Sequence, residues 1–220
     1  MFFIIILFSG VALYYALKYL MKPEERDVRN KKTSNFKEFG LLSPNNQLKG
    51  KYLDEWADIW WQWVYSFNKD KHPIVDKTGR LAYLGDMGDI YFLGGSFEKK
   101  PITRSVTIKK GKAIFFPIIN TIYELSDHMS CSEGIGNINR SFNAKNIYLE
   151  INGVALEGLS KYKSTSKTCF SIIPESDFRA ISTGYWIALT SLPTGYYIIS
   201  FGGEEGLFKQ DITYRLRIID

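Results

Sequence analysis

The sequence predicts a mainly β protein: an antiparallel β-sandwich or jelly-roll-like domain with one packed aromatic helix, preceded by an N-terminal transmembrane helix. Aromatic residues make up 15% of the 220 residues, a proportion typical of sheets. Most of the chain beyond residue 85 consists of short β-type runs separated by turn residues. The first twenty residues are almost entirely apolar. These observations divide the chain into an anchor (1–21), a polar stalk (22–50) and one domain (51–220).

The predicted anchor is an apolar run from Phe2 to Leu20 whose only charge is Lys18. As a helix rising roughly 1.5 Å per residue it would span about 28 Å, close to the ~30 Å hydrocarbon core of a bilayer. The run lacks the basic start and the small-residue cleavage site of a signal peptide, so an uncleaved signal-anchor is favoured over a cleaved leader. The lipid membrane is therefore the first expected partner, contacted by Phe2, Ile5, Leu7, Leu13 and Leu20.

The net charge of +5 is unevenly placed along the chain. Residues 1–50 carry eight Lys or Arg and four acids, whereas residues 51–220 carry twenty and nineteen. The nearly neutral domain lacks the electrostatic footprint of a nucleic-acid binder, so nucleic acid is excluded as a partner. Basic residues directly after a span tend to stay cytoplasmic, which predicts a single-pass protein with its domain in a reducing compartment.

One soluble helix is predicted from Tyr52 to Phe67, where large apolar side chains recur at three- and four-residue spacing. Such a stripe is typical of a helix that covers a sheet, although it also fits a sugar-stacking platform. Trp61 and Gln62 fall off the stripe and are expected at the surface, where they are candidate binding residues.

Eight strands are expected at a spacing that favours a sandwich or jelly roll. Residues 109–112 and the pair Asn152-Gly153 are expected to form hairpin turns, and residues 124–145 a long loop. The strict alternation of 213–218 predicts a strand with one buried face and two arginines in solvent. The expected strands are 90–97, 103–108, 113–119, 146–151, 168–173, 185–189, 196–201 and 212–219.

Few residues suit catalysis or metal binding. His72 and Asp76 fit a proline-ordered turn better than a catalytic pair. Glu124, His128 and Cys131 would need a fourth ligand for structural zinc or an orienting partner for a nucleophile, and neither can be placed. We therefore expect no cofactor, no metal and no catalytic residue. Two cysteines, Cys131 and Cys169, can form one disulfide or none.

Several segments resemble an uncharacterised family of secreted or membrane-anchored β-rich proteins found in bacteria and large DNA viruses. The resemblance covers most of residues 51–220 and implies the fold and domain limits, but no activity. It also implies a cysteine pair where this chain has Ala82 or Tyr83 and Val106, which fits a reducing compartment, and a Gln where this chain has Asp86. The similar segments are EWADIWWQWVYS (55–66), HPIVDKTG (72–79), GDMGDIYFLGGSF (85–97), RSVTIKKGKAIFFPIIN (104–120) and LPTGYYIISFGG with FKQDITYRLRI (192–219).

The favoured function is a non-enzymatic, membrane-anchored structural or interaction protein. Its expected protein partner is a capsid or envelope layer, as for a minor capsid protein at the interface of a viral internal membrane and capsid, or a protein of a cell envelope. The alternative is a carbohydrate-binding or adhesin-like domain that stacks a glycan on Trp61 and neighbouring aromatic residues. The candidate binding residues are Trp61, Gln62, His72, Asp76 and Asp86. An enzyme built on His72/Asp76 or His128/Cys131 is the third hypothesis.

Overall fold

The structure is a computed structural model that describes residues 39–220 except 69, 70, 99 and 175. It contains the helices α2 (Leu53–Tyr65) and α3 (Cys131–Ser141), and the short 3-10 helices η4 (Ala82–Gly85) and η5 (Leu159–Tyr162). The predicted anchor lies outside the described residues. No helix among the described residues has both the length and the apolar character needed to cross a bilayer.

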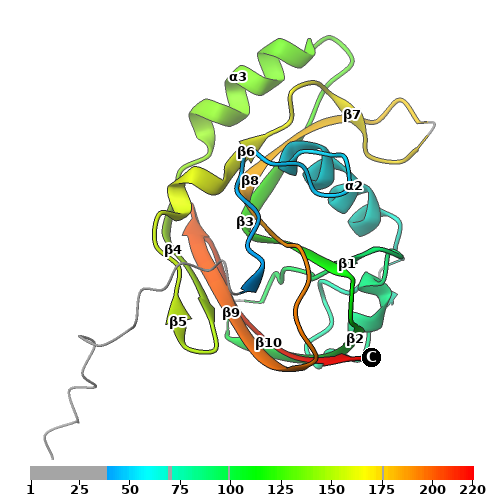
Figure 1. Cartoon of the computed structure of the whole chain (residues 1–220). Coiled ribbons are helices and arrows are strands. Elements are labelled where there is room, and N and C mark those ends of the chain that lie inside the picture. Colours follow the sequence, from blue (N-terminus) through cyan, green and yellow to red (C-terminus); the bar gives the residue numbers. More distant parts are fainter. Residues whose placement is uncertain (1–38, 69–70, 99, 175) are drawn as a thin grey trace, which may run out of the picture. The chain divides into compact units, whose positions relative to one another are not determined.

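Two five-stranded sheets form the domain, which confirms a mainly β fold (Figure 1). The first sheet has the order β1-β3-β8-β6, with β7 also paired to β8, and the second has the order β2-β10-β9-β4-β5. The strands are β1 (Ile90–Phe92), β2 (Ile102–Lys109), β3 (Ala113–Glu124), β4 (Ala144–Ile151), β5 (Val154–Ala155), β6 (Lys163–Thr165), β7 (Phe170–Ser171), β8 (Arg179–Leu189), β9 (Gly195–Glu205) and β10 (Phe208–Ile219).

The sheets are not purely antiparallel, which corrects the expectation from sequence. Strand β1 pairs with β3 in parallel, and β2 pairs with β10 in parallel. Residues 109–112 therefore form no hairpin, because β2 and β3 lie in different sheets and this turn carries the chain from one to the other. The turn at Asn152-Gly153 is confirmed: both residues have positive φ, 51° and 78°, and join β4 to β5.

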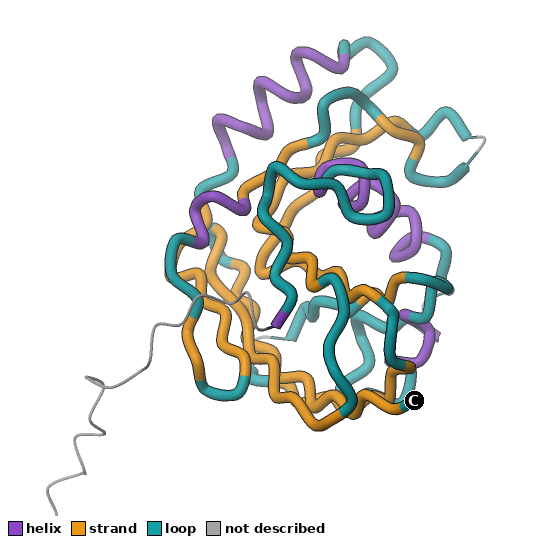
Figure 2. Tube along the Cα trace, viewed as in Figure 1, coloured by secondary structure: helices purple, strands orange, loops and turns teal. Residues whose placement is uncertain are grey.

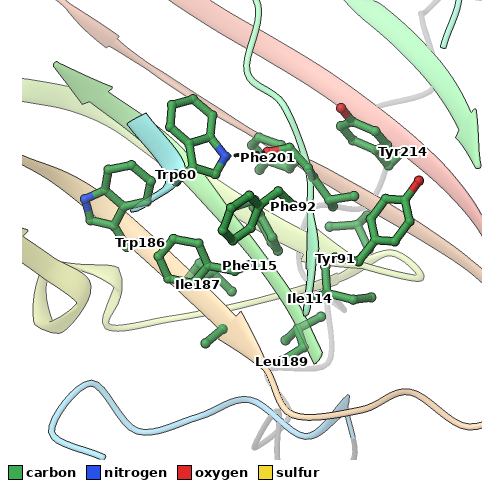
Figure 3. Close-up of a cluster of buried hydrophobic side chains, with 14 of the residues drawn as sticks. Trp60, Tyr91, Phe92, Ile114, Phe115, Trp186, Ile187, Leu189, Phe201 and Tyr214 are labelled. Atoms are coloured by element: carbon green, nitrogen blue, oxygen red, sulfur yellow. Dashed lines mark hydrogen bonds between the residues drawn. The ribbon is translucent and has the colours of Figure 1, made fainter. Parts of the chain in front are cut away.

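One hydrophobic core fills the space between the sheets and continues under α2. Strand β3 serves both sides, since successive side chains of a strand point to opposite faces. Phe115 stacks on Trp186 at 5.4 Å, whereas Phe116 packs against Phe201 of the other sheet at 4.6 Å. Figure 3 shows Trp60 next to Trp186 on the helix side of this core. A strand covered on both faces needs a continuous apolar run, and AIFFPII supplies it.

Helix α2 is the predicted aromatic helix, and its stripe is core. Glu55 accepts a hydrogen bond from the Tyr52 amide at 2.8 Å, closing the first turn. Trp60 and Trp63 are buried, and their indole nitrogens donate to the carbonyls of Leu93 (3.1 Å) and Leu84 (2.9 Å). These bonds connect the helix to the segments that flank β1, and so they fix the wall of the cleft described below.

Two segments that were expected to be irregular have defined structure or pack on the domain. Part of the long loop forms α3, which begins after Ser130, whose side chain accepts from the Glu133 amide. The described part of the stalk, residues 39–50, packs on the domain, because Phe39 and Leu48 are buried. Figure 2 shows this segment as a loop that leads into α2.

A disulfide joins Cys131, the first residue of α3, to Cys169 before β7. It fastens the start of the helix to the segment that precedes the strand pairing with β8. Disulfides form and persist in oxidising compartments. A reducing compartment, expected from charge and from the missing cysteine pair, would not preserve this bridge, and the compartment stays a prediction.

Candidate binding cleft

A cleft of about 310 Å³ opens where α2, β3 and the β9–β10 turn meet. Helix α2 supplies three aromatic side chains, the segment after β1 supplies Gly95 to Phe97, and β3 supplies residues 120–122. The lining residues are Trp60, Trp61, Tyr65, Ile74, Gly95, Ser96, Phe97, Asn120, Thr121, Ile122, Glu205, Phe208 and Gln210. Its walls are thus formed by segments up to 150 positions apart in sequence. No local sequence pattern predicts that these segments lie together.

Trp61 lies in the wall of this cleft and is not a surface residue, as the sequence had suggested. Only 7% of it is exposed, because its ring packs edge-on against Trp60 at 5.2 Å and contacts Tyr65 at 6.2 Å. The helix is covered on more than one face, so a position off the main stripe is buried too. Its indole Nε1 has no hydrogen-bond partner among the described residues.

Asn120 carries a second unpaired donor. Its Nδ2 is buried without a partner among the described residues. The neighbouring amide of Gln210 is fully used: Oε1 accepts from the Ser96 amide at 3.1 Å, and Nε2 donates to the Ile118 carbonyl at 2.7 Å. Leaving a buried donor unpaired costs about 1–3 kcal/mol. The cleft therefore holds two N–H groups that a ligand with acceptors would stabilise.

Two further aromatic side chains and a single carboxylate belong to the lining. Phe97 is 63% exposed and contacts Phe208 at 6.3 Å. Tyr65 donates to a Glu124 carboxylate oxygen at 3.0 Å, and burial together with this bond raises the pKa of Tyr65 to about 12, so the phenol stays neutral. Glu205 is the one charged residue in the lining.

Of the other sequence-predicted binding residues, none lines this cleft. Gln62 donates to the Ser171 carbonyl at 2.8 Å and so connects α2 to β7. His72 packs edge-on against Phe67 at 6.1 Å, and its Nδ1 accepts from the Ile74 amide at 3.3 Å. Burial lowers the pKa of His72 below its usual value, so the ring is neutral at pH 7.

The two predicted aspartates order loops. Asp76 accepts from the Thr78 amide at 2.9 Å and the Leu81 amide at 2.7 Å, which is the turn interpretation made from sequence. Burial alone would raise the pKa of Asp76, but these hydrogen bonds lower it below its usual range. Asp86 accepts from the Lys112 ammonium and the Gly88 amide, and the lysine bond lowers its pKa.

The residues of the enzyme hypothesis are found in a disulfide, an open hollow and a turn. Cys131 is bonded to Cys169 and is not a free nucleophile. No group of three His, Cys, Asp or Glu side chains among the described residues could hold a metal ion. His128 lines an open, polar hollow beside α3 together with Glu133 and Arg140. His72 and Asp76 each bond to backbone amides of their own turn.

Sequence reasoning missed Asp58, the most strongly perturbed carboxyl. It lies on α2 and its Oδ1 accepts from Ser166 at 2.6 Å and from Ser182 at 3.1 Å. Burial raises the pKa of Asp58 to about 7, against the opposing effect of the two serine bonds. Both serines are buried, so the cluster connects helix and sheet rather than facing a substrate. Asp58 lies among aromatic residues of a predicted helix, and nothing in this local pattern predicts that its carboxyl is buried.

No family model matches this chain, and no curated protein matches it. Two solved structures are distantly similar. The solution structure of Amebosin has 11% sequence identity and a TM-score of 0.21, over 54% of this chain and 96% of that one. The structure of PbICP-C in complex with falcipain-2 has 8% identity and a TM-score of 0.29, over 60% of this chain and 100% of that one.

Proposed function

We propose that residues 39–220 form a non-catalytic binding domain that takes one neutral sugar residue of a glycan into the aromatic cleft. The observation that supports it is the pair of unpaired N–H donors, Trp61 Nε1 and Asn120 Nδ2, in the walls of a cleft lined by Tyr65, Phe97 and Phe208. Ligand sites commonly combine apolar walls with a few polar groups that fix orientation.

The chemistry of the lining selects a neutral ligand. No cation lines the cleft, and Glu205 would repel an anion. Glu205 and the aromatic rings attract a cation, but a cation would leave the N–H donors of Trp61 and Asn120 unpaired. A sugar ring satisfies both constraints: its hydroxyls accept from the two N–H groups and can donate to Glu205, while its C–H faces pack on aromatic rings.

Binding requires a small movement of the walls, because both N–H groups are shielded from solvent in this structure. Rotation of the Asn120 amide about its last side-chain bond would exchange its oxygen and nitrogen, presenting Nδ2 to the cleft. Phe97, mostly exposed, can swing aside without loss of core packing. The free energy of two unpaired donors, about 1–3 kcal/mol each, offsets the cost of this movement.

A membrane anchor at Phe2–Leu20 would hold this domain at a bilayer as a single-pass protein, in a cell envelope or in a virion. The role as a minor capsid protein that links an internal membrane to a capsid layer stays a prediction. The cleft favours the glycan-binding alternative over it, because an aromatic cleft with unpaired donors in its walls suits a single ligand residue rather than a flat protein layer.

The test is a titration of the full chain, in detergent, with a panel of neutral monosaccharides and oligosaccharides, followed by isothermal calorimetry and tryptophan fluorescence. Trp61→Phe keeps an aromatic ring but removes the N–H, and we expect it to weaken binding about tenfold, equivalent to ~1.4 kcal/mol. The matched control is Trp186→Phe, because Trp186 Nε1 is also buried and unpaired, but the residue does not line the cleft.

No saturable binding to any sugar of the panel would refute the proposal, as would equal effects of the two tryptophan substitutions. Binding of acidic sugars alone would contradict the argument from Glu205. Turnover of a bound glycan, detected by mass spectrometry, would show that the domain is an enzyme and refute the non-catalytic proposal.

A further inference from the structure

The outward face of the second sheet carries a shallow groove of about 530 Å³ across β2, β10 and β9, distinct from the cleft. The strand register places its outward side chains in two rows. One row is Thr107, Arg217 and Tyr196, and the next is Ser105, Arg215 and Ile198. Leu216 and Ile218 point the opposite way into the core, as the alternation of β10 requires.

This groove combines positive charge with exposed apolar surface. Arg215 and Arg217 are exposed and belong to no ion pair recorded among the described residues, and the Arg217 guanidinium lies over the Tyr196 ring at 5.9 Å. Tyr196 is 76% exposed and Ile198 51%. No carboxylate lines the groove. Contiguous apolar surface that is rimmed by polar residues is typical of interaction sites, and Tyr196 and Ile198 are neighbours on the same face of β9.

We propose that this groove docks onto the surface of a bilayer that contains anionic lipid. Arginines attract the negative headgroups, and a tyrosine and an aliphatic side chain between them suit the interfacial region, where amphipathic rings gather. A soluble anion would satisfy the arginines but would leave Ile198 in water. A bilayer surface accommodates both kinds of side chain together.

The groove and the cleft lie at opposite ends of β9 and β10. Tyr196, which lines the groove, is the second residue of β9. The glycan cleft uses Glu205 and Gln210, at the other end of the same two strands. From Gln210 to Arg217 along β10 is about 24 Å at ~3.4 Å per residue. Docking of the groove therefore leaves the cleft open to solvent.

The test uses the full chain with a polarity-sensitive fluorophore on Thr107→Cys. Both natural cysteines are in the disulfide, so the introduced thiol is the single reactive one among the described residues. The control is the same dye on Asn143→Cys. Asn143 precedes Ala144, which pairs with Glu205, about 30 Å along β9 from Tyr196 at ~3.4 Å per residue.

Labelled protein is added to phosphatidylcholine vesicles with and without phosphatidylserine. We expect a blue shift of the Thr107 label with the anionic vesicles only, no shift at position 143, and loss of the shift at about 1 M salt, where the screening length is ~3 Å. Each of Arg215→Gln and Arg217→Gln should weaken the lipid-dependent shift about fivefold, which corresponds to ~1 kcal/mol per charge near the surface.

Three results would overturn the proposal: equal emission with neutral and anionic vesicles, a shift that survives both arginine substitutions, or the same shift on adding a soluble acidic peptide to neutral vesicles. Flotation of the chain with the vesicles reports the predicted anchor separately, because it does not depend on the label's environment. The predictions for the groove and for the anchor can therefore be refuted independently. Sugar binding by the cleft is measured in a separate experiment.

Discussion

Arg104 Nη1 donates to the Tyr214 hydroxyl at 2.9 Å, and both side chains are buried. The same guanidinium donates to the carbonyls of Gly94, Gly95 and Ile74, and Tyr214 in turn donates to Gly94 at 3.0 Å. A buried cation is thus satisfied mainly by backbone oxygens. These bonds join the segments that contain Ile74 and Gly95, two residues that line the cleft.

We expect Arg104→Met to lower the free energy of unfolding by about 3 kcal/mol or more, because several buried carbonyls lose their donor. Tyr214→Phe removes one hydroxyl and should cost about 1–2 kcal/mol. Denaturant unfolding measures both. Arg215→Met, at an exposed position of the neighbouring strand, is the control and should change stability by less than about 0.5 kcal/mol. A loss at Arg104 no larger than at Arg215 would contradict the role given to this network.

The carboxyl of Asp58 predicts a pH dependence of stability. Its pKa is raised from 3.8 to about 7 in the folded state, so between these values the folded protein keeps a proton that the unfolded chain has lost. Its contribution is therefore complete below pH 4, falls as pH rises, and is gone above pH 7. The change amounts to up to about 4 kcal/mol.

Asp58→Asn should remove this dependence, so the difference in unfolding free energy between the natural chain and the variant should shift steadily from pH 4 to pH 7. Urea melts at several pH values measure it. The groups that surround Asp58 are Asp54 and Glu55, which raise its pKa, and Lys167, which is paired with Asp54 at 3.3 Å. A constant difference across this range would show that Asp58 titrates normally.

Reduction of the Cys131–Cys169 bridge should destabilise the domain. The bond closes a chain segment of 38 residues, for which the loop-entropy relation gives about 4 kcal/mol. The double substitution to serine should have the same effect, and a reducing agent should then change nothing further. Unfolding that is equally easy with and without reductant would indicate that the cysteines are not joined. In intact vesicles, protection of the bridge from a membrane-impermeant reductant would place the domain on the inner side of the membrane.

Gly202 and the Gln210 carbonyl approach so closely that a side chain on the glycine would lie 2.0 Å from that oxygen. Gly202→Ala should therefore separate β9 from β10 and cost more than about 3 kcal/mol, with weaker sugar binding because Glu205 and Phe208 move too. The control is Gly136→Ala in α3, where only a flexible arginine stands nearby; there alanine should stabilise by about 0.5–1 kcal/mol. Thermal melts of both variants decide the matter.

Local patterns predicted those parts of the fold that depend on local physics. The alternation in β10 correctly placed Arg215 and Arg217 outside, and Asn152-Gly153 correctly marked a turn. The start of α3 also has a local signal, the capping-box spacing of Ser130 and Glu133, although the surrounding segment is typical of a loop.

Other features depend on contacts between distant segments and leave no local trace. Nothing near residues 109–112 indicates that the next strand joins the other sheet. Trp61 looked exposed because helical spacing reports one buried face, while the cleft wall buries a second. The unpaired indole of Trp61 and amide of Asn120 follow from that tertiary arrangement, so the candidate site emerged only with the structure.

Strand β10 lies between β2 and β9, so the last strand of the chain sits inside its sheet instead of at the edge. During synthesis β2 has no neighbour in this sheet until residues 208–219 leave the ribosome. The second sheet is therefore completed late, because the partner of β2 lies more than a hundred residues further along the chain. Loss of these final residues would leave two unpaired strand edges, a species prone to aggregate, whereas a truncation at a sheet margin would remove only that margin.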